Sequence, residues 1–256
     1  MIGLLIRTPI LKRLVPSILK KIFKFKKKNR GFFQINNFEM FLDFFDPIDR
    51  EIILFKEFEK EEIDFLLKQL KYSKAKIFLD IGSNCGYYSI LISSKNYINK
   101  IFAFDPNQDA NFKFKKTLLK NTKNAKKITL HSIGLSNRNT KLKIKSLKKD
   151  NYVQTGGSSV VKTYTKGSYV ESFENFKKGD DVLKITKSII GIKIDVEGYE
   201  LEVLMGLKKT ISQNHCIIQI EIFRKNFSKI NNYLISLNFR LIKKVEKRSN
   251  YFFKNF

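Results

Sequence analysis

Acidic residues follow apolar segments at several places along the chain, where their carboxylates could bind a cation or accept a proton. Asp80 and Asp105 each come at the end of an early apolar run, and Asp195, Glu197 and Glu221 come at the ends of two later ones. When such runs form the parallel strands of an open sheet, their carboxyl ends lie at one edge, where these sheets bind ligands. The sequence therefore predicts one acidic site assembled from segments that are far apart in the chain.

A turn rich in glycine follows the first apolar run. Residues 76–79 are predicted to form a buried strand, and the apolar and small residues from 87 to 93 are predicted to open a helix. Glycine allows a tight turn and a close approach of the backbone to a ligand. A strand, a glycine turn and a helix N-terminus form the usual place for an adenosine-containing cofactor in this class of sheet. The predicted cofactor contacts in this turn are Gly82, Ser83, Asn84 and Gly86.

Charge indicates which cofactor would bind there. A dinucleotide site has the pattern Gly-x-Gly-x-x-Gly, but Asn84 and Tyr87 occupy its second and third glycine positions. Asp80 beside the turn would repel a pyrophosphate and attract a cofactor that carries an ammonium and a sulfonium group, as S-adenosylmethionine (SAM) does. The alternative is that Asp80 only caps the turn. Asp105 comes 19 residues after Gly86, which places it to accept both ribose hydroxyl groups.

A third motif contains two acids and a glycine. Residues 191–194 are predicted to form a strand that runs into Asp195 and Glu197, and Gly198 precedes a helix predicted over residues 199–207. With this motif added to the two before it, the chain resembles the FkbM family of SAM-dependent methyltransferases over about residues 32–253. The matching segments are residues 79–88, 103–106, 134–137, 157–159, 192–206 and 218–222.

The resemblance implies a fold and an activity. The fold is α/β and Rossmann-like, as in class I methyltransferases, with a seven-stranded, mostly parallel sheet, an antiparallel closing strand and helices on both faces. The parallel part also follows from the alternation of predicted strands and helices. The implied activity is SAM-dependent O-methylation of a sugar hydroxyl in a glycan, such as a surface polysaccharide, or in a glycosylated metabolite. Gly134, in a predicted turn at 134–137, is expected beside the adenine of the cofactor.

Three carboxylates are the candidates for catalysis. Methyl transfer would be an in-line displacement by an oxygen nucleophile, accelerated largely by alignment of the two substrates. Asp195, Glu197 or Glu221 could accept the proton of the hydroxyl group, and each could instead cap a turn or contact SAM. His131 belongs to the residue type that most often acts as a base. It is a weaker candidate because it lies within a predicted strand at 127–132 rather than beyond the end of that strand.

The remaining segments must position these residues. A hairpin is predicted within residues 31–55, a helix over 57–70, and an antiparallel strand pair between 239 and 253. Residues 138–188 depart from strand–helix alternation and are predicted to lie over the open end of the sheet and to shape the acceptor site. In the family a Gly-Tyr-Glu segment precedes the cofactor strand. Glu57, Phe58 and Glu59 occupy that place here, so no role is assigned to Glu59.

The chain is strongly basic. It has 50 Lys and Arg residues against 24 Asp and Glu residues, a net charge of +26, and ten of the basic residues lie within residues 1–30, which contain no acid. This N-terminal arm is predicted to be a basic amphipathic helix that precedes the methyltransferase domain at 31–256. It either binds an anionic membrane surface through residues 7–30 or packs on the domain with solvated lysines. Its apolar runs are too short to cross a membrane, and it shows no signal-peptide pattern.

The same features suggest other functions and a compartment. The charge would suit a methyltransferase acting on RNA or another polymer, but no RNA-binding motif is recognisable, so nucleic acid is not the expected partner. A non-enzymatic membrane-surface protein and a nicotinamide oxidoreductase are further alternatives, and Asn84 and Tyr87 disfavour the latter. Cys85 and Cys216 indicate a reducing compartment, so the protein is expected in the cytoplasm or at the periphery of the cytoplasmic membrane. Two histidines without zinc-type spacing predict no metal site.

Overall fold

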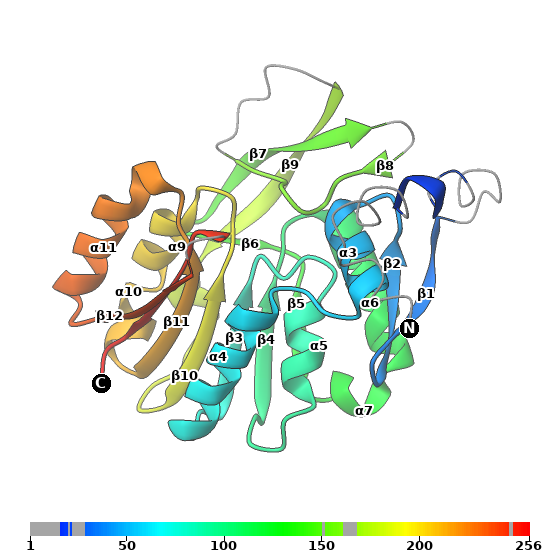
Figure 1. Cartoon of the computed structure of the whole chain (residues 1–256). Helices are drawn as coiled ribbons and strands as arrows, with labels where there is room; N and C mark the ends of the chain where they lie inside the picture. The colour runs from blue at the N-terminus through cyan, green and yellow to red at the C-terminus, as the bar shows by residue number, and fades with distance from the viewer. Residues whose placement is uncertain (1–15, 20, 22–28, 150–151, 161–167, 246–247) are drawn as a thin grey trace.

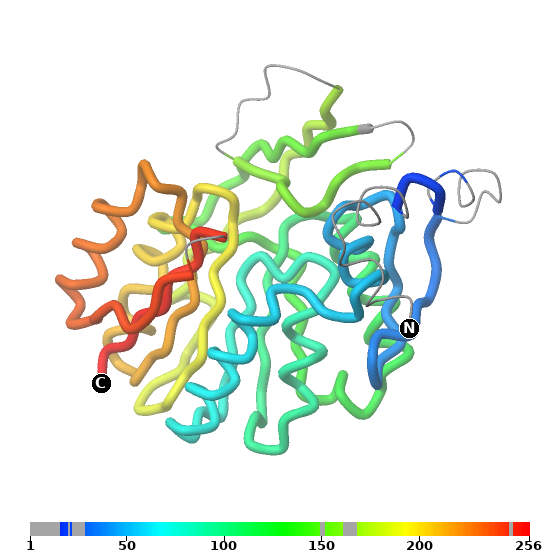
Figure 2. The backbone as a smooth tube through the Cα atoms, viewed as in Figure 1, coloured from blue at the N-terminus to red at the C-terminus, as the bar shows by residue number. Residues whose placement is uncertain are grey.

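The computed structural model describes residues 16–19, 21, 29–149, 152–160, 168–245 and 248–256 (Figures 1 and 2). Most of the N-terminal arm lies outside these residues, so its amphipathic helix and its membrane contact stay predictions. Residues 16–19 and 21 are helical. Leu19 packs against the core of the domain, whereas Ile18 is exposed.

In the part of the chain that the structure describes, a seven-stranded sheet has the order β12-β13-β11-β10-β3-β4-β5. Its strand pairs are parallel except for the two that β13 makes, with β11 and β12, which are antiparallel. The predicted mostly parallel sheet with an antiparallel closing strand is therefore confirmed. The strands are β3 (Ile77–Ile81), β4 (Lys100–Phe104), β5 (Ile128–His131), β10 (Ile189–Ile194), β11 (His215–Glu221), β12 (Arg240–Val245) and β13 (Asn250–Lys254).

Helices cover both faces of this sheet (Figure 1). Successive residues of a strand point to opposite faces, so Phe78 packs with helices α4 and α5 while Leu79 packs with α9, α10 and α11. The helices on the first face are α4 (Lys60–Tyr72) and α5 (Tyr87–Ser93), and those on the second are α9 (Glu200–Gly206), α10 (Lys208–Ser212) and α11 (Phe227–Ser236). The others include α6 (Gln108–Lys120), α7 (Thr122–Ala125), α8 (Gly179–Val182) and the 3-10 helix η1 (Arg224–Asn226).

The predicted hairpin before the main sheet is confirmed as β1 (Arg30–Ile35) and β2 (Phe38–Asp43), which pair antiparallel. The helix α3 (Pro47–Phe55), which follows it, was not predicted. Its start carries a sequence signal, because Asp46 accepts hydrogen bonds from two backbone N–H groups of the first turn and proline is favoured at the first helical position. The hairpin packs on α6, where the rings of Phe41 and Phe112 lie 5.7 Å apart.

As far as the described residues show, a second sheet of four strands has the order β6-β9-β7-β8 and lies beyond the carboxyl ends of the main strands (Figure 1). The predicted turn at 134–137 is wrong in part, because residues 134–136 form β6, which pairs with β9. Gly134 permits this pairing, since a Cβ atom there would lie 2.2 Å from the Phe176 ring. The strands are β6 (Gly134–Ser136), β7 (Thr140–Lys149), β8 (Tyr152–Val153) and β9 (Ser168–Lys178).

Candidate active site

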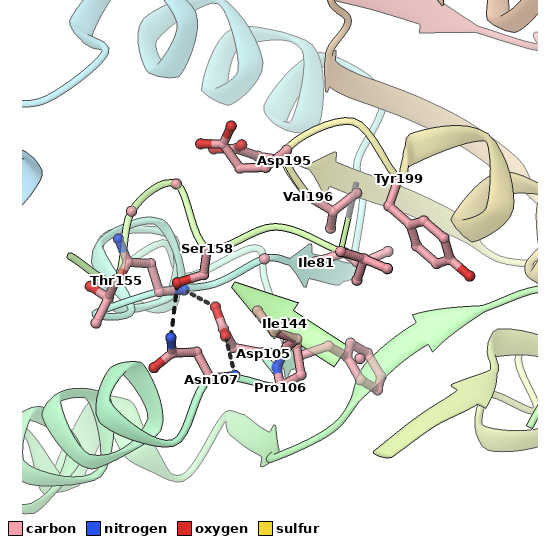
Figure 3. Close-up of a pocket in the computed structure, with 18 of the residues that line it drawn as sticks. Ile81, Asp105, Pro106, Asn107, Ile144, Thr155, Ser158, Asp195, Val196 and Tyr199 are labelled. Carbon is pink, nitrogen blue, oxygen red and sulfur yellow. Dashed lines mark hydrogen bonds between the residues drawn. The ribbon is translucent and has the colours of Figure 1, made fainter. Parts of the chain in front are cut away.

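A cavity lies between the carboxyl ends of β3, β4 and β10 and the loop segment 155–160, which follows β8. It encloses about 710 Å³ of empty space including its open mouth. Its two sides differ in polarity, so it suits a ligand with one apolar and one polar half. Figure 3 shows Ile81, Ile144, Val196 and Tyr199 on the apolar side and Asp105, Asn107, Thr155 and Ser158 on the polar side.

The glycine turn after β3 forms part of the cavity wall. Gly82 has a φ of +79°, and a Cβ atom there would lie 1.8 Å from the backbone oxygen of Asp195. Only glycine can therefore bring this turn into backbone contact with the turn after β10. Of the predicted cofactor contacts, Gly82, Asn84, Asp105 and Gly134 line the cavity.

The other three predicted cofactor contacts, Asp80, Ser83 and Gly86, do not line the cavity. Asp80 is fully buried and accepts a hydrogen bond from Ser89 Oγ at 2.6 Å. Its side chain points to the α5 face of the sheet because side chains alternate along β3. Burial raises the pKa of Asp80, and the nearby Lys193 ammonium opposes that rise. Ser83 is buried, and Gly86 caps α5 with a φ of +82°. These three residues therefore support the turn from the side that faces away from the cavity.

Asp105 ties the end of β4 to the glycine turn. Its Oδ2 accepts a hydrogen bond from the backbone N–H of Asn84 at 2.8 Å, and its Oδ1 accepts one from the backbone N–H of Asn107 at 2.8 Å. Burial raises the pKa of Asp105 to about 6, although these two hydrogen bonds favour the ionised form. Each carboxylate oxygen retains a second lone pair. The group can therefore accept further hydrogen bonds from a ligand with neighbouring hydroxyl groups.

Three carboxylates meet at the ends of β10 and β11. One oxygen atom from each of Asp195, Glu197 and Glu221 lies within 4.8 Å of the others. Asp195 and Glu197 also line the cavity. Burial raises the pKa of Glu221 to about 9, with the Asp195 carboxylate as the next contributor. The cluster can attract a cationic group, and three carboxylates are also a ligand set that a hard divalent ion accepts, although the sequence predicted no metal site.

A polar network that the sequence did not predict lies beneath this cluster. Lys193 is buried, with its ammonium 3.0 Å from Asp195 Oδ2 and 4.8 Å from the centre of the Tyr88 ring. Burial alone would lower the pKa of Lys193, but the carboxylates of Asp195, Glu59 and Asp80 together raise it above its usual value. Lys193 therefore stays charged and offsets part of the negative charge. A lysine inside an otherwise apolar strand was the only feature of the sequence that indicated this polar network.

Glu59, to which no role was assigned, belongs to the same network. The Tyr88 hydroxyl donates to Glu59 Oε2 at 2.6 Å and accepts from Gln219 Nε2 at 2.8 Å. Arg248 lies 3.9 Å from Glu59. Burial raises the pKa of Glu59, and Lys193 opposes the rise. The network connects α4, α5 and β11 below the acidic cluster, so it can hold the cluster in place.

The loop after β8 covers the cavity, in agreement with the prediction that residues 138–188 lie over the open end of the sheet. Thr155 donates its backbone N–H to Asp46 Oδ2 at 2.9 Å and its hydroxyl to Asn84 Oδ1 at 2.7 Å. On the other side, Ser159 Oγ donates to the backbone oxygen of Glu197 at 2.8 Å. The loop is thus attached to both turns that form the cavity.

His131, the alternative base, lies outside the cavity lining. Its ring stacks on Phe104, with the ring centres 4.7 Å apart and the planes 9° apart. Burial lowers the pKa of His131. Its position indicates a packing role in the edge strand of the sheet.

Comparisons with known proteins show which proteins the chain is similar to. A sequence profile of the methyltransferase FkbM domain matches residues 80–241. The hexuronic acid methyltransferase AglP of Haloferax volcanii is 28% identical over 167 residues, which are 63% of this chain and 62% of that protein. The chain thus spans less than two thirds of the length of this curated relative.

Two solved structures resemble the fold. The methyltransferase FkbM of Methylobacillus flagellatus has a TM-score of 0.51 and 16% identity, covering 71% of this chain and 44% of its own. A human methyltransferase 10 domain containing protein has a TM-score of 0.51 and 8% identity, covering 93% of this chain and 95% of its own. At these identities the two structures show the fold alone.

Proposed function

Because the chain belongs to the FkbM methyltransferase family, we propose that it uses SAM to methylate a hydroxyl group of a sugar in a glycan or a glycosylated metabolite. The observation that supports this best is a cavity with a buried carboxylate, Asp105, at one end and the acidic cluster at the other. The sugar acceptor rests on the analogy with the hexuronic acid methyltransferase to which the chain is similar.

The residues of the cavity fit SAM. The apolar side, with Ile81, Ile144 and Tyr199, would hold the adenine, and Asp105 would accept hydrogen bonds from the ribose hydroxyl groups. Gly82 leaves room for the ligand to approach the backbone. Asp195 would attract the cationic part of the cofactor. A dinucleotide would instead bring a pyrophosphate toward these carboxylates, so the charge of the site favours SAM.

SAM supplies an electrophilic methyl group when bound, and the chain must align the acceptor oxygen and take its proton. We assign the role of proton acceptor to Glu197, which lines the cavity. Its Oε1 would lie 3.7 Å from a Cβ atom placed on Gly157 in the covering loop. Lys193 forms an ion pair with Asp195, their charged atoms 3.0 Å apart. Burial and the Asp195 carboxylate raise the pKa of Glu221, which favours its protonated form over the form that accepts a proton. The cluster would also repel a carboxylate nucleophile, which favours a hydroxyl group.

The cofactor assignment is tested by calorimetry. SAM and S-adenosylhomocysteine should bind and NAD should not, and preferential binding of NAD would overturn the proposal. Asp105→Ala should weaken SAM binding by about 1–3 kcal/mol through the loss of hydrogen bonds to the ribose. Asp181→Asn, which removes an exposed acid, is the matched control and should bind SAM as the wild type does.

The assignment of the base is tested at saturating SAM with a panel of glycosides. Glu197→Gln should lose about 10²–10⁴-fold in turnover while it still binds SAM. Glu221→Gln resembles the protonated wild-type side chain, so it should lose less than about tenfold. Full turnover by Glu197→Gln would remove this residue from the mechanism and leave alignment or Asp195.

We also propose that the protein acts in the cytoplasm, at the membrane periphery, through residues 7–30 of the arm. The support is the ten basic residues and no acid within residues 1–30. Among the described residues, no helix is long and apolar enough to span a bilayer. Removal of residues 1–30 should abolish binding to anionic liposomes and leave SAM affinity intact. Unchanged liposome binding would contradict the membrane role, and loss of the folded state would favour packing of the arm on the domain.

A further inference from the structure

A second hollow adjoins the cofactor cavity at residues 197–199. Glu197 and Tyr199 line both spaces. The hollow encloses about 1160 Å³ including its open mouth. Its walls are the turn after β10, Glu202 of α9, and the segment from Phe223 to Lys229 that leads from β11 into α11. We call it the α9–α11 groove.

The position of the groove suits an acceptor. In-line transfer requires the attacking oxygen to approach the methyl group from the side opposite its leaving group, and a space that adjoins the cofactor cavity at Glu197 can hold an acceptor there. Glu197 stands at the boundary of the two spaces and has a φ of +56°. Such left-handed conformations of non-glycine residues are costly and occur preferentially at functional sites. An acceptor in the groove would bring its hydroxyl group to the residue that we assign as the base.

The groove has an acidic inner end and a basic outer wall. Glu197 and Glu202 lie on the side of α9, whereas Lys225 and Lys229 line the side of α11. The two lysines are four residues apart in η1 and α11, a spacing that places them on one helical face. Both are exposed, and within the described residues neither forms an ion pair. Their ammonium groups are therefore able to contact an anion in the groove.

We propose that the α9–α11 groove is the acceptor site and that it selects a sugar acid, whose carboxylate contacts Lys225 and Lys229 while a hydroxyl group faces Glu197. This rests on the proposed function and adds the chemical class of its substrate. The acidic inner end would repel the acceptor carboxylate and the lysines would attract it, so the charge pattern orients the sugar. A neutral sugar would lack that orientation.

The test measures binding rather than turnover, with protein saturated with S-adenosylhomocysteine. Calorimetry or ligand-observed NMR compares methyl β-D-glucuronoside with the neutral methyl β-D-glucoside. The wild type should prefer the glucuronoside by about tenfold, which a single charge-assisted hydrogen bond can supply. The double variant Lys225→Gln/Lys229→Gln should lose this preference and bind the glucoside as before. Its affinity for S-adenosylhomocysteine should be unchanged.

The matched control is Lys115→Gln/Lys123→Gln, which removes the same charge from exposed positions in α6 and α7. Because the whole chain is strongly basic, an attraction that depended only on net charge would fall equally in both double variants. An equal loss in both, or no preference for the glucuronoside in the wild type, would overturn the groove assignment. Failure to bind S-adenosylhomocysteine would instead contradict the proposed function itself, so the two failures are distinguishable.

Discussion

Lys113 is a buried cation whose removal should destabilise the protein in a pH-dependent way. Its ammonium lies 2.7 Å from Asp49 Oδ2 and 3.8 Å from Asp46 Oδ2, and the side chains of all three residues are 0–1% exposed. It also donates a hydrogen bond to Thr155 Oγ1 at 2.8 Å, in the loop that covers the cavity. Lys113→Met keeps much of the apolar stem and leaves the two carboxylates without their cation.

The size of the expected loss of stability follows from the burial of the ion pair. Removal of one partner from a buried ion pair destabilises a protein by about 3–5 kcal/mol, a large part of the ~5–15 kcal/mol by which domains are stable. We expect the lower end, about 3 kcal/mol, because Asp49 can take up a proton once the lysine is absent. Burial already raises the pKa of Asp49 to about 6, against the opposing effect of Lys113. The loss should therefore be smaller at about pH 5 than at about pH 8.

The assay is urea denaturation followed by circular dichroism at these two pH values, for the wild type, Lys113→Met and Lys115→Met. Lys115 is an exposed lysine of the same helix, so its variant controls for helix propensity and net charge. The reasoning is refuted if Lys113→Met loses less than about 1 kcal/mol at the higher pH, or if its loss is equal at both pH values.

Three further outcomes are expected. Gly82→Ala should destabilise the protein by at least about 1–3 kcal/mol, the cost of a left-handed non-glycine residue, and should abolish SAM binding. The control is Gly31→Ala, whose Cβ would meet nothing within 4 Å and which should have neither effect. Calorimetry with SAM measures the binding of both variants. The free energy of unfolding of the ligand-free protein should fall as pH rises from about 5 to about 8. Burial raises the pKa of both Asp49 and Asp105 from 3.8 to about 6, so over this range the folded protein loses protons that the unfolded chain has already lost at lower pH. A rise in the free energy of unfolding over that range, measured by urea titration, would contradict this prediction. Thr155→Val should destabilise the protein by about 1–3 kcal/mol, since buried partners lose their hydrogen bonds, and limited proteolysis should cut the covering loop faster than in the wild type.

The local pattern of the chain was sufficient for the parallel sheet and for the sheet edge at which the candidate cavity lies. Short apolar runs followed by helical segments predicted the strands, since strand–helix alternation leaves a parallel sheet as the main solution. Gly82, Asn84 and Asp105 were predicted to lie together because each comes within three residues of a strand end, and strand ends of such a sheet share one edge. All three line the cavity. The meeting of Asp195 with Glu221 followed from the same rule, because β10 and β11 are neighbours.

Tertiary structure alone decided which face each side chain occupies and which distant residues meet. Asp80 lies next to the glycine turn in the chain, but the alternation of β3 turns its carboxylate to Ser89 and away from the cavity. Residues 134–136 form a strand because residues 176–178 of β9, each 42 positions later in the chain than its partner, pair with them. The contacts of Lys193 with Tyr88, and of Lys113 with Asp49, join segments that no local pattern connects. Burial then shifts the pKa values of these groups, because desolvation depends on everything that packs around them.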